Sequence, residues 1–160
     1  MTTELLTIGL SRWTLAIGLL AALVLTLGGL QTRSANAETV CSNASLSVDV
    51  ITKNNKKYVP IDVQGMSDLG DGLTLDIFSI YQDELVGTGK FAPDAIILGP
   101  DGFVIRAERD AKGDGRVYGV IIRVLDSNDV TICSESLPVS VPKGNHPASG
   151  TPQYNSTVPG

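Results

Sequence analysis

Histidine, cysteine and paired carboxylates are the residue types in this chain that can carry covalent or acid–base chemistry. His146 is the only histidine, and it lies beside Pro147 in a stretch rich in proline and glycine, where nothing orients it. A serine or cysteine nucleophile needs a base held within hydrogen-bond reach, so this placement argues against such a pair. Neighbouring carboxylates such as Asp83 and Glu84 occur, but a general acid needs an enclosed pocket that raises its pKa. We therefore predict that the protein is not an enzyme.

Aspartates occur with glycine and asparagine in three short segments. Calcium binding is therefore a more specific hypothesis than acid–base catalysis. The six candidate ligands are Asp68, Asp71, Asp110, Asp114, Asp126 and Asp129. The segment that begins at Asp110 does not match an EF-hand loop, because Lys112 and Ile121 occupy positions that need oxygen ligands. A calcium site formed between loops stays open, beside the alternative that these residues only make turns. No other cofactor is expected.

The two cysteines, Cys41 and Cys133, lie at opposite ends of the region that contains the strand patterns. In an exported protein such a pair is most simply a disulfide, and the alternative is two buried free thiols. Two cysteines and one distant histidine make a poor zinc set.

An apolar stretch of 18 uncharged residues, 13–30, follows Arg12 and leads to a polar segment that ends in Ala35-Asn36-Ala37. This pattern is typical of a signal peptide with a small-x-small cleavage site, so we predict a signal peptide over 1–37 and a mature start at Glu38. The alternative is an uncleaved anchor, because about 17 to 25 apolar residues span a bilayer. After cleavage we expect no stable membrane insertion, and export to the periplasm, the cell surface or the medium.

The chain is acidic, with 12 Lys and Arg against 17 Asp and Glu and a formal net charge of −5. Its longest basic cluster is Lys56-Lys57. Because binding to a phosphate backbone or an anionic lipid surface requires a basic patch, we expect neither nucleic acid nor a lipid surface as a partner.

Between residues 38 and 142 the sequence alternates apolar and polar residues in short runs, as β-strands with one buried face do. We expect the 103–107 and 116–125 strands to form a hairpin, with 116–125 central. In 73–81, the alternation places Leu75 and Ile77 on one face, extending to Ser79 and Tyr81. The predicted strands span 46–50, 58–63, 73–81, 95–98, 103–107 and 116–125, then 130–133 and 137–141 as one bent or interrupted strand.

About seven short strands without convincing helical periodicity predict an all-β domain, an immunoglobulin-like antiparallel β-sandwich over residues 38–142. Residues 143–160 are rich in proline, glycine and serine and have almost no aliphatic side chains. Such a segment buries little apolar surface, so we predict that 143–160 is a disordered C-terminal tail.

The second half of the domain carries four motifs, Pro93-Asp94-Ala95, then Arg106-Ala107-Glu108-Arg109, then GDGRVY over residues 113–118, then VSVP over residues 139–142. Together they resemble an Ig-like domain found near the C-termini of many large secreted or surface bacterial proteins, where it follows repeats, peptidases or other catalytic domains. The resemblance implies the fold and no catalytic residues. The chain departs from that family by its two cysteines and by the sequence of its Asp126 turn. The residues singled out as a structural motif are Arg106, Glu108, Arg109, Asp114, Gly115, Arg116 and Tyr118.

The motif has a local physical account. Tyr118 follows the glycine-containing turn and is placed to pack inward and return its hydroxyl to nearby backbone, as in the tyrosine corner of sandwich folds. Arg106, Glu108 and Arg109 are expected to pair with acids on neighbouring strands.

These observations predict an exported, non-enzymatic Ig-like binding or structural module at the bacterial envelope or outside the cell, with an unidentified protein or cell-surface ligand. The alternative is a calcium-dependent or glycan-binding adhesin-type domain. For glycan binding, the candidate aromatic residues after the signal segment are Tyr58, Phe78, Tyr81, Phe91, Phe103, Tyr118 and Tyr154.

Overall fold

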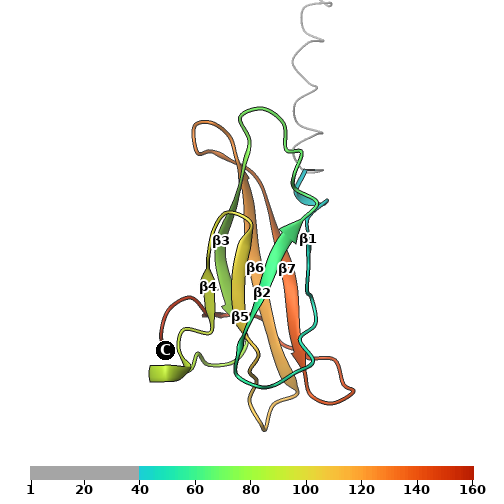
Figure 1. The fold of residues 1–160 in the computed structure, drawn as a ribbon, viewed down its shortest axis with the longest axis vertical. Helices are drawn as coiled ribbons and strands as arrows, with labels where there is room; N and C mark the ends of the chain where they lie inside the picture. The colour runs from blue at the N-terminus through green and yellow to red at the C-terminus, as the bar shows by residue number, and fades with distance from the viewer. Residues whose placement is uncertain (1–39) are drawn as a thin grey trace, which may run out of the picture. The chain divides into compact units, whose positions relative to one another are not determined.

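The computed structural model describes residues 40–160, which form two four-stranded antiparallel sheets (Figure 1). One sheet has the strand order β1-β2-β5-β4 and the other β7-β6-β3-β8. The strands are β1 (Ser45–Leu46), β2 (Tyr58–Gln64), β3 (Thr74–Gln82), β4 (Ala95–Ile97), β5 (Gly102–Arg106), β6 (Gly115–Leu125), β7 (Thr131–Pro142) and β8 (Tyr154–Asn155). A 3₁₀ turn, Gly89–Phe91, precedes β4.

This strand order is that of an immunoglobulin fold, in which strands A, B, E and D form one sheet and C, F and G the other. Here β1 to β7 take the places of A to G in chain order, and β8 adds a strand beside β3. After β1 the chain crosses to the second sheet, where Val50 makes a parallel bridge to Ser140 of β7. The predicted Ig-like β-sandwich is confirmed, although the first strand is shorter than the predicted 46–50.

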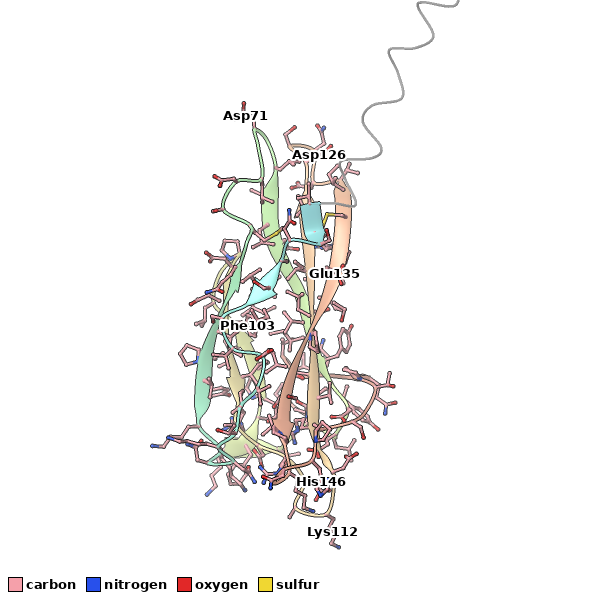
Figure 2. All side chains as sticks on the ribbon, turned by 90° about the vertical axis from the view of Figure 1, so that its right-hand side faces the viewer. Asp71, Phe103, Lys112, Asp126, Glu135 and His146 are labelled. Atoms are coloured by element: carbon pink, nitrogen blue, oxygen red, sulfur yellow. A yellow bond between two sulfur atoms is a disulfide. The ribbon has the colours of Figure 1, made fainter. Side chains whose placement is uncertain are left out.

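The core lies between the two sheets, with Phe103 on the inner side of the first sheet (Figure 2). β6 is central, as predicted, because β7 and β3 pair with its two edges. Every second residue of β6 from Tyr118 to Val124 is completely buried. The largest apolar side chains with less than 2% exposure are Tyr118, Phe103, Ile61, Ile80, Ile105 and Ile122.

The predicted hairpin between 103–107 and 116–125 is wrong. β5 pairs with β2 and β4, whereas β6 pairs with β3 and β7. The two strands belong to different sheets, and the 107–114 connection crosses from one to the other. Alternation alone cannot distinguish these cases, since both strands bury one face.

A β-bulge in β3 changes which face of the strand is buried. The register shifts between Ile77, opposite Ile122, and Ser79, opposite Ile121. Beyond this point Ile80 and Gln82 face the core with no exposed surface, and Tyr81 is only partly buried. The expectation that Tyr81 shares a face with Ile77 is therefore wrong, because the extra residue inverts the alternation.

The prediction that residues 143–160 are a disordered tail is also wrong. Residues of β8 pair with Tyr81 and Gln82 at the edge of β3, and Ser156 is completely buried. The segment crosses β6 at two glycines: a Cβ on Gly119 would lie 3.2 Å from Pro152, and one on Gly115 2.7 Å from Ala148. Backbone hydrogen bonds hold it in place of apolar side chains, so the domain extends past 142.

The disulfide between Cys41 and Cys133 is confirmed; it joins the segment before β1 to the start of β7 (Figure 2). Cys41 is 2% exposed and belongs to the core. The predicted signal peptide over 1–37 and the mature start at Glu38 lie outside the described residues. Within 40–160, no helix has the length and apolar character needed to cross a membrane.

Candidate functional site

Asp94 lies between the ends of the two sheets, immediately before β4, and is only 1% exposed. Its Oδ2 accepts hydrogen bonds from Arg116 Nη1 at 3.0 Å and from Gln82 Nε2 at 2.9 Å. Its Oδ1 lies 3.3 Å from Arg106 Nε in an ion pair. One carboxylate therefore receives two guanidinium groups in a place that water does not reach.

Arg116 links this carboxylate to the corner between β5 and β6. Its Nε donates to Glu84 Oε2 at 2.7 Å, and its Nη1 donates to the Tyr118 hydroxyl at 3.1 Å. Tyr118 in turn donates its hydroxyl to the carbonyl of Arg106 at 3.0 Å. This hydrogen bond back to upstream backbone is the predicted tyrosine corner, which is confirmed.

Arg106 is held on its other side by the loop before β4 and by β2. Its Nη2 donates to the Tyr58 hydroxyl at 2.9 Å and to the carbonyl of Pro93 at 3.1 Å. The guanidinium carbon lies 4.5 Å from the centre of the Tyr58 ring, a cation–π arrangement. Arg106 thus ties β5 to β2 and to the segment that leads into β4.

Burial and neighbouring charges set the pKa values of this network. Burial of Arg116 opposes its positive charge, but Tyr118, Glu84 and Asp94 outweigh that effect and raise the pKa of Arg116. Burial raises the pKa of Tyr118, although the nearby Arg116 acts in the opposite direction. The tyrosine is consequently neutral and the arginine charged at neutral pH.

An open concavity of about 540 Å³ lies directly over this network. Its lining comes from the loop after β3, the connection between β5 and β6, the start of β6, and β8. The lining residues are Asp83, Glu84, Leu85, Gly87, Glu108, Arg109, Asp110, Gly113, Asp114, Gly115, Arg116 and Tyr154. Five carboxylates against two guanidinium groups make the lining acidic.

Several carboxylates of the concavity are fixed by backbone. Both oxygens of Glu84 accept from the amide of Asp110, at 3.0 and 2.8 Å. Asp83 accepts from the amide of Val117 at 2.9 Å. Two apolar residues of the lining are exposed to solvent, Leu85 at 73% and Tyr154 at 36%. The concavity therefore combines fixed negative charge with an exposed apolar wall.

The six aspartates proposed as calcium ligands do not form one site. Asp71 and Asp126 lie at one end of the sandwich, whereas the loop that carries Lys112, between Asp110 and Asp114, lies at the other (Figure 2). The loops at Gly72 and Ser127 are adjacent, since a Cβ on Gly72 would lie 3.9 Å from that of Ser127. In the part of the chain that the structure describes, no three His, Cys, Asp or Glu side chains are grouped as a metal site.

Hydrogen bonds already occupy three of these carboxylates. Asp126 accepts from the amides of Asn128 and Val130 at 2.8 and 2.9 Å. These backbone hydrogen bonds, with that to Val130 the stronger cause, lower the pKa of Asp126. Asp110 accepts from the amide of Lys112 at 2.9 Å. A hydrogen bond from the Ser149 hydroxyl lowers the pKa of Asp114. The contacts of Asp110 and Asp126 are those of turn-forming aspartates, whereas Asp114 binds a serine 35 residues away.

Two exposed phenylalanines each have a cation over the ring. Phe78 is 54% exposed, and the Arg123 guanidinium lies 3.9 Å from its ring centre. Lys56 lies 4.6 Å from the ring centre of Phe91. A sugar stacks on an open aromatic face, so these two rings offer it less surface than their exposure suggests. Phe103 and Tyr118 are in the core.

The remaining motif residues divide between two roles. Glu108 lies 3.5 Å from Lys56 Nζ and 3.9 Å from Arg106 Nε, so the expected pairing with acids holds for Arg106, whereas the partners of Glu108 are basic. Arg109 lines the concavity, and its buried Nη1 has no hydrogen-bond partner. His146 is exposed, and it lies at the same end of the molecule as Lys112 (Figure 2).

Asp94 and Glu84 were missed as partners of the two arginines. Asp94 stands directly before an apolar run, Ala95 to Leu98, which is a position where a charged residue is rarely buried without a partner. The position of Asp94 is visible in the sequence, but its partners are not. Arg106 and Arg116 lie 12 and 22 residues further along the chain and meet Asp94 only in the folded domain.

No family model, curated protein or solved structure matches this chain. The resemblance to the bacterial Ig-like domain therefore stays a prediction.

Proposed function

We propose that this protein is an exported, non-enzymatic Ig-like module that binds a protein or cell-surface ligand through the acidic concavity. The observation that carries the proposal is the position of that concavity over the Asp94 network, at the end of the sandwich where the loops after β3 and β5 meet. A surface for recognition is most effective when a rigid scaffold positions it.

The lining favours a partner that presents basic side chains. Its carboxylates outnumber its guanidinium groups, and Leu85 and Tyr154 offer apolar surface beside them. A lysine or arginine has an aliphatic stem that packs on apolar surface and a charged head that pairs with carboxylates. The Tyr154 ring adds a face for a cation.

Export and the absence of catalysis are parts of the same proposal. The disulfide supports an oxidising compartment. The exposed position of His146, in a turn after β7, supports a role other than general base. The envelope or extracellular location rests on the predicted signal peptide and on the resemblance of the second half of the chain.

A random peptide library displayed on phage, panned on the purified disulfide-bonded protein, tests this proposal. We expect enrichment of peptides with lysine or arginine, whose affinity falls about tenfold or more when Leu85→Ser or Asp114→Asn removes one element of the lining. Leu98→Ser is the matched control, because Leu98 is 67% exposed but follows β4, outside the concavity. Peptides that bind wild type and the Leu85 variant equally would refute the concavity as the recognition surface.

A further inference from the structure

Residues 148–160, here called the strap, cross the glycines of β6 and then pair with the edge of β3; the surface of the body that receives them is here called the groove. The groove exists because β6 has glycines where the strap crosses it. A Cβ on Gly119 would lie 3.2 Å from Pro152. On the strap, a Cβ on Gly150 would lie 1.8 Å from Asp83 Oδ2 and 2.7 Å from its Cγ. Each glycine thus leaves room for a side chain of the opposite surface, Pro152 of the strap over Gly119 and Asp83 of the body over Gly150.

Backbone groups of the body recognise the strap as an added strand. The amides of Gln153 and Ser156 donate to the carbonyls of Gln82 and Ile80 at 2.9 and 2.8 Å. The carbonyl of Ser156 accepts from the amides of Asp94 and Ala95 at 3.0 and 2.9 Å. The strap therefore contacts β3 of one sheet and the start of β4 of the other, and its departure would leave an unpaired edge at both.

Few apolar contacts retain the strap. Ser156 is its one fully buried residue, and Tyr154 and Val158 are 36% and 50% exposed. The strap joins β7 through a turn in which Gly144 has a φ of +67°, a conformation that glycine adopts without strain. Segments that are held mainly by backbone hydrogen bonds and bury little apolar surface open at a lower free energy than the rest of a domain.

We propose that this groove is an interaction site for the strap of a second copy of the chain, so that two copies join by exchange of residues 148–160. The second copy is the occupant because its strap carries the same Gly150, Pro152 and Ser156 that fit the groove within one chain. Exchange of an identical element makes no new kind of contact. Within one chain the strap has a high effective concentration at its own groove. The exchanged form therefore becomes populated when the strap is prevented from binding the groove of its own chain.

Two full-length variants with complementary defects test the proposal. Gly119→Val closes the groove with a side chain that meets Pro152 and leaves the strap unchanged. Gly150→Val prevents the strap from seating, because the new side chain meets Asp83, which the Val117 amide holds, and leaves the groove unchanged. We expect each variant alone to be monomeric by light scattering, and an equimolar mixture to form a one-to-one dimer in which the strap of Gly119→Val seats in the groove of Gly150→Val, which is one of the two contacts of the exchange. Monomers in the mixture would overturn the proposal.

A second measurement remains informative where Gly119→Val fails to fold. A fluorescent peptide of residues 147–160 is titrated into wild type and into Gly150→Val, with Gly99→Ala as the control, because a Cβ on Gly99 meets nothing within 4 Å. We expect at least about tenfold tighter binding to Gly150→Val than to wild type or the control, since the strap of those two competes within the chain. Equal binding to all three, or no binding to Gly150→Val, would overturn the proposal.

Discussion

Asp94 is a carboxylate that is withdrawn from water and shared by two arginines. Burial of a charge is costly unless it is paired and hydrogen-bonded, and here Arg106, Arg116 and Gln82 supply the partners. The cost of transferring the ions out of water offsets much of their attraction, so such a cluster contributes little net stability against an apolar alternative. Removal of one partner is strongly destabilising, because the remaining charges stay buried without compensation.

We expect Asp94→Asn to lower the free energy of unfolding by about 3 to 5 kcal/mol, the usual cost of breaking a buried ion pair. Urea denaturation at neutral pH measures the loss. Asp76→Asn is the matched control, because Asp76 pairs with Arg123 at the surface with 36% of its side chain exposed, and such pairs contribute about 0 to 1 kcal/mol. Similar losses in both variants would contradict a special role for Asp94.

The lowered pKa of Asp126 predicts a pH dependence of stability. Unfolded aspartate titrates at about pH 3.9, whereas the folded carboxylate, held by the Val130 and Asn128 amides, keeps its charge to lower pH. In that window the unfolded state binds more protons, so stability falls as the pH is lowered. We expect Asp126→Asn to be less stable than wild type at pH 7 and the difference to shrink below about pH 4. Thermal unfolding across pH 2 to 7 measures it, and a constant difference would contradict the assignment.

At the scale of the elements, the connection between β5 and β6 and the edge of β3 organise the candidate site. The connection carries Asp110 and Asp114 across from one sheet to the other and places them beside the loop after β3. The bulge at Phe78 turns Gln82 inward, where it reaches Asp94. Without that inversion Gln82 would face solvent, and the network would lose one donor.

We expect Tyr118→Phe to lower the free energy of unfolding by about 0.5 to 1.5 kcal/mol, because it removes a buried hydrogen bond to the carbonyl of Arg106, which then keeps only the amide of Glu108 as a donor. The shape of the corner is otherwise kept. Tyr154→Phe is the control, since Tyr154 is 36% exposed and should change stability little. Guanidinium chloride unfolding distinguishes the two, and equal small effects would mean that the corner hydroxyl does not stabilise the fold.

For the whole domain, the disulfide closes a loop between residues 92 positions apart in sequence. It fastens the segment before β1 to β7, two parts of the chain that otherwise meet through short stretches such as the Val50 bridge. In the chain-entropy account its main effect is on the unfolded state, whose freedom it restricts.

We expect the double variant Cys41→Ser, Cys133→Ser to lose about 4 to 5 kcal/mol of unfolding free energy by that account, with far-UV circular dichroism unchanged at low temperature. Thermal unfolding of wild type with and without a strong reductant provides the matched comparison. If reduction leaves the melting temperature of wild type unchanged, the bridge does not contribute as argued.

The sequence by itself determined the strand patterns, the sandwich class, the cysteine pair and the tyrosine corner, because each depends on local periodicity or on a residue type with few structural roles. It did not determine the partners of Arg106 and Arg116, the sheet to which each strand belongs, or the ordering of residues 143–160. Those depend on residues far apart in sequence: Asp94 meets its arginines, and the strap meets the β3 edge, only when both sheets are assembled. The strap shows the reason most plainly, since backbone hydrogen bonds and bare glycines hold it, and neither leaves a hydrophobic pattern in the sequence.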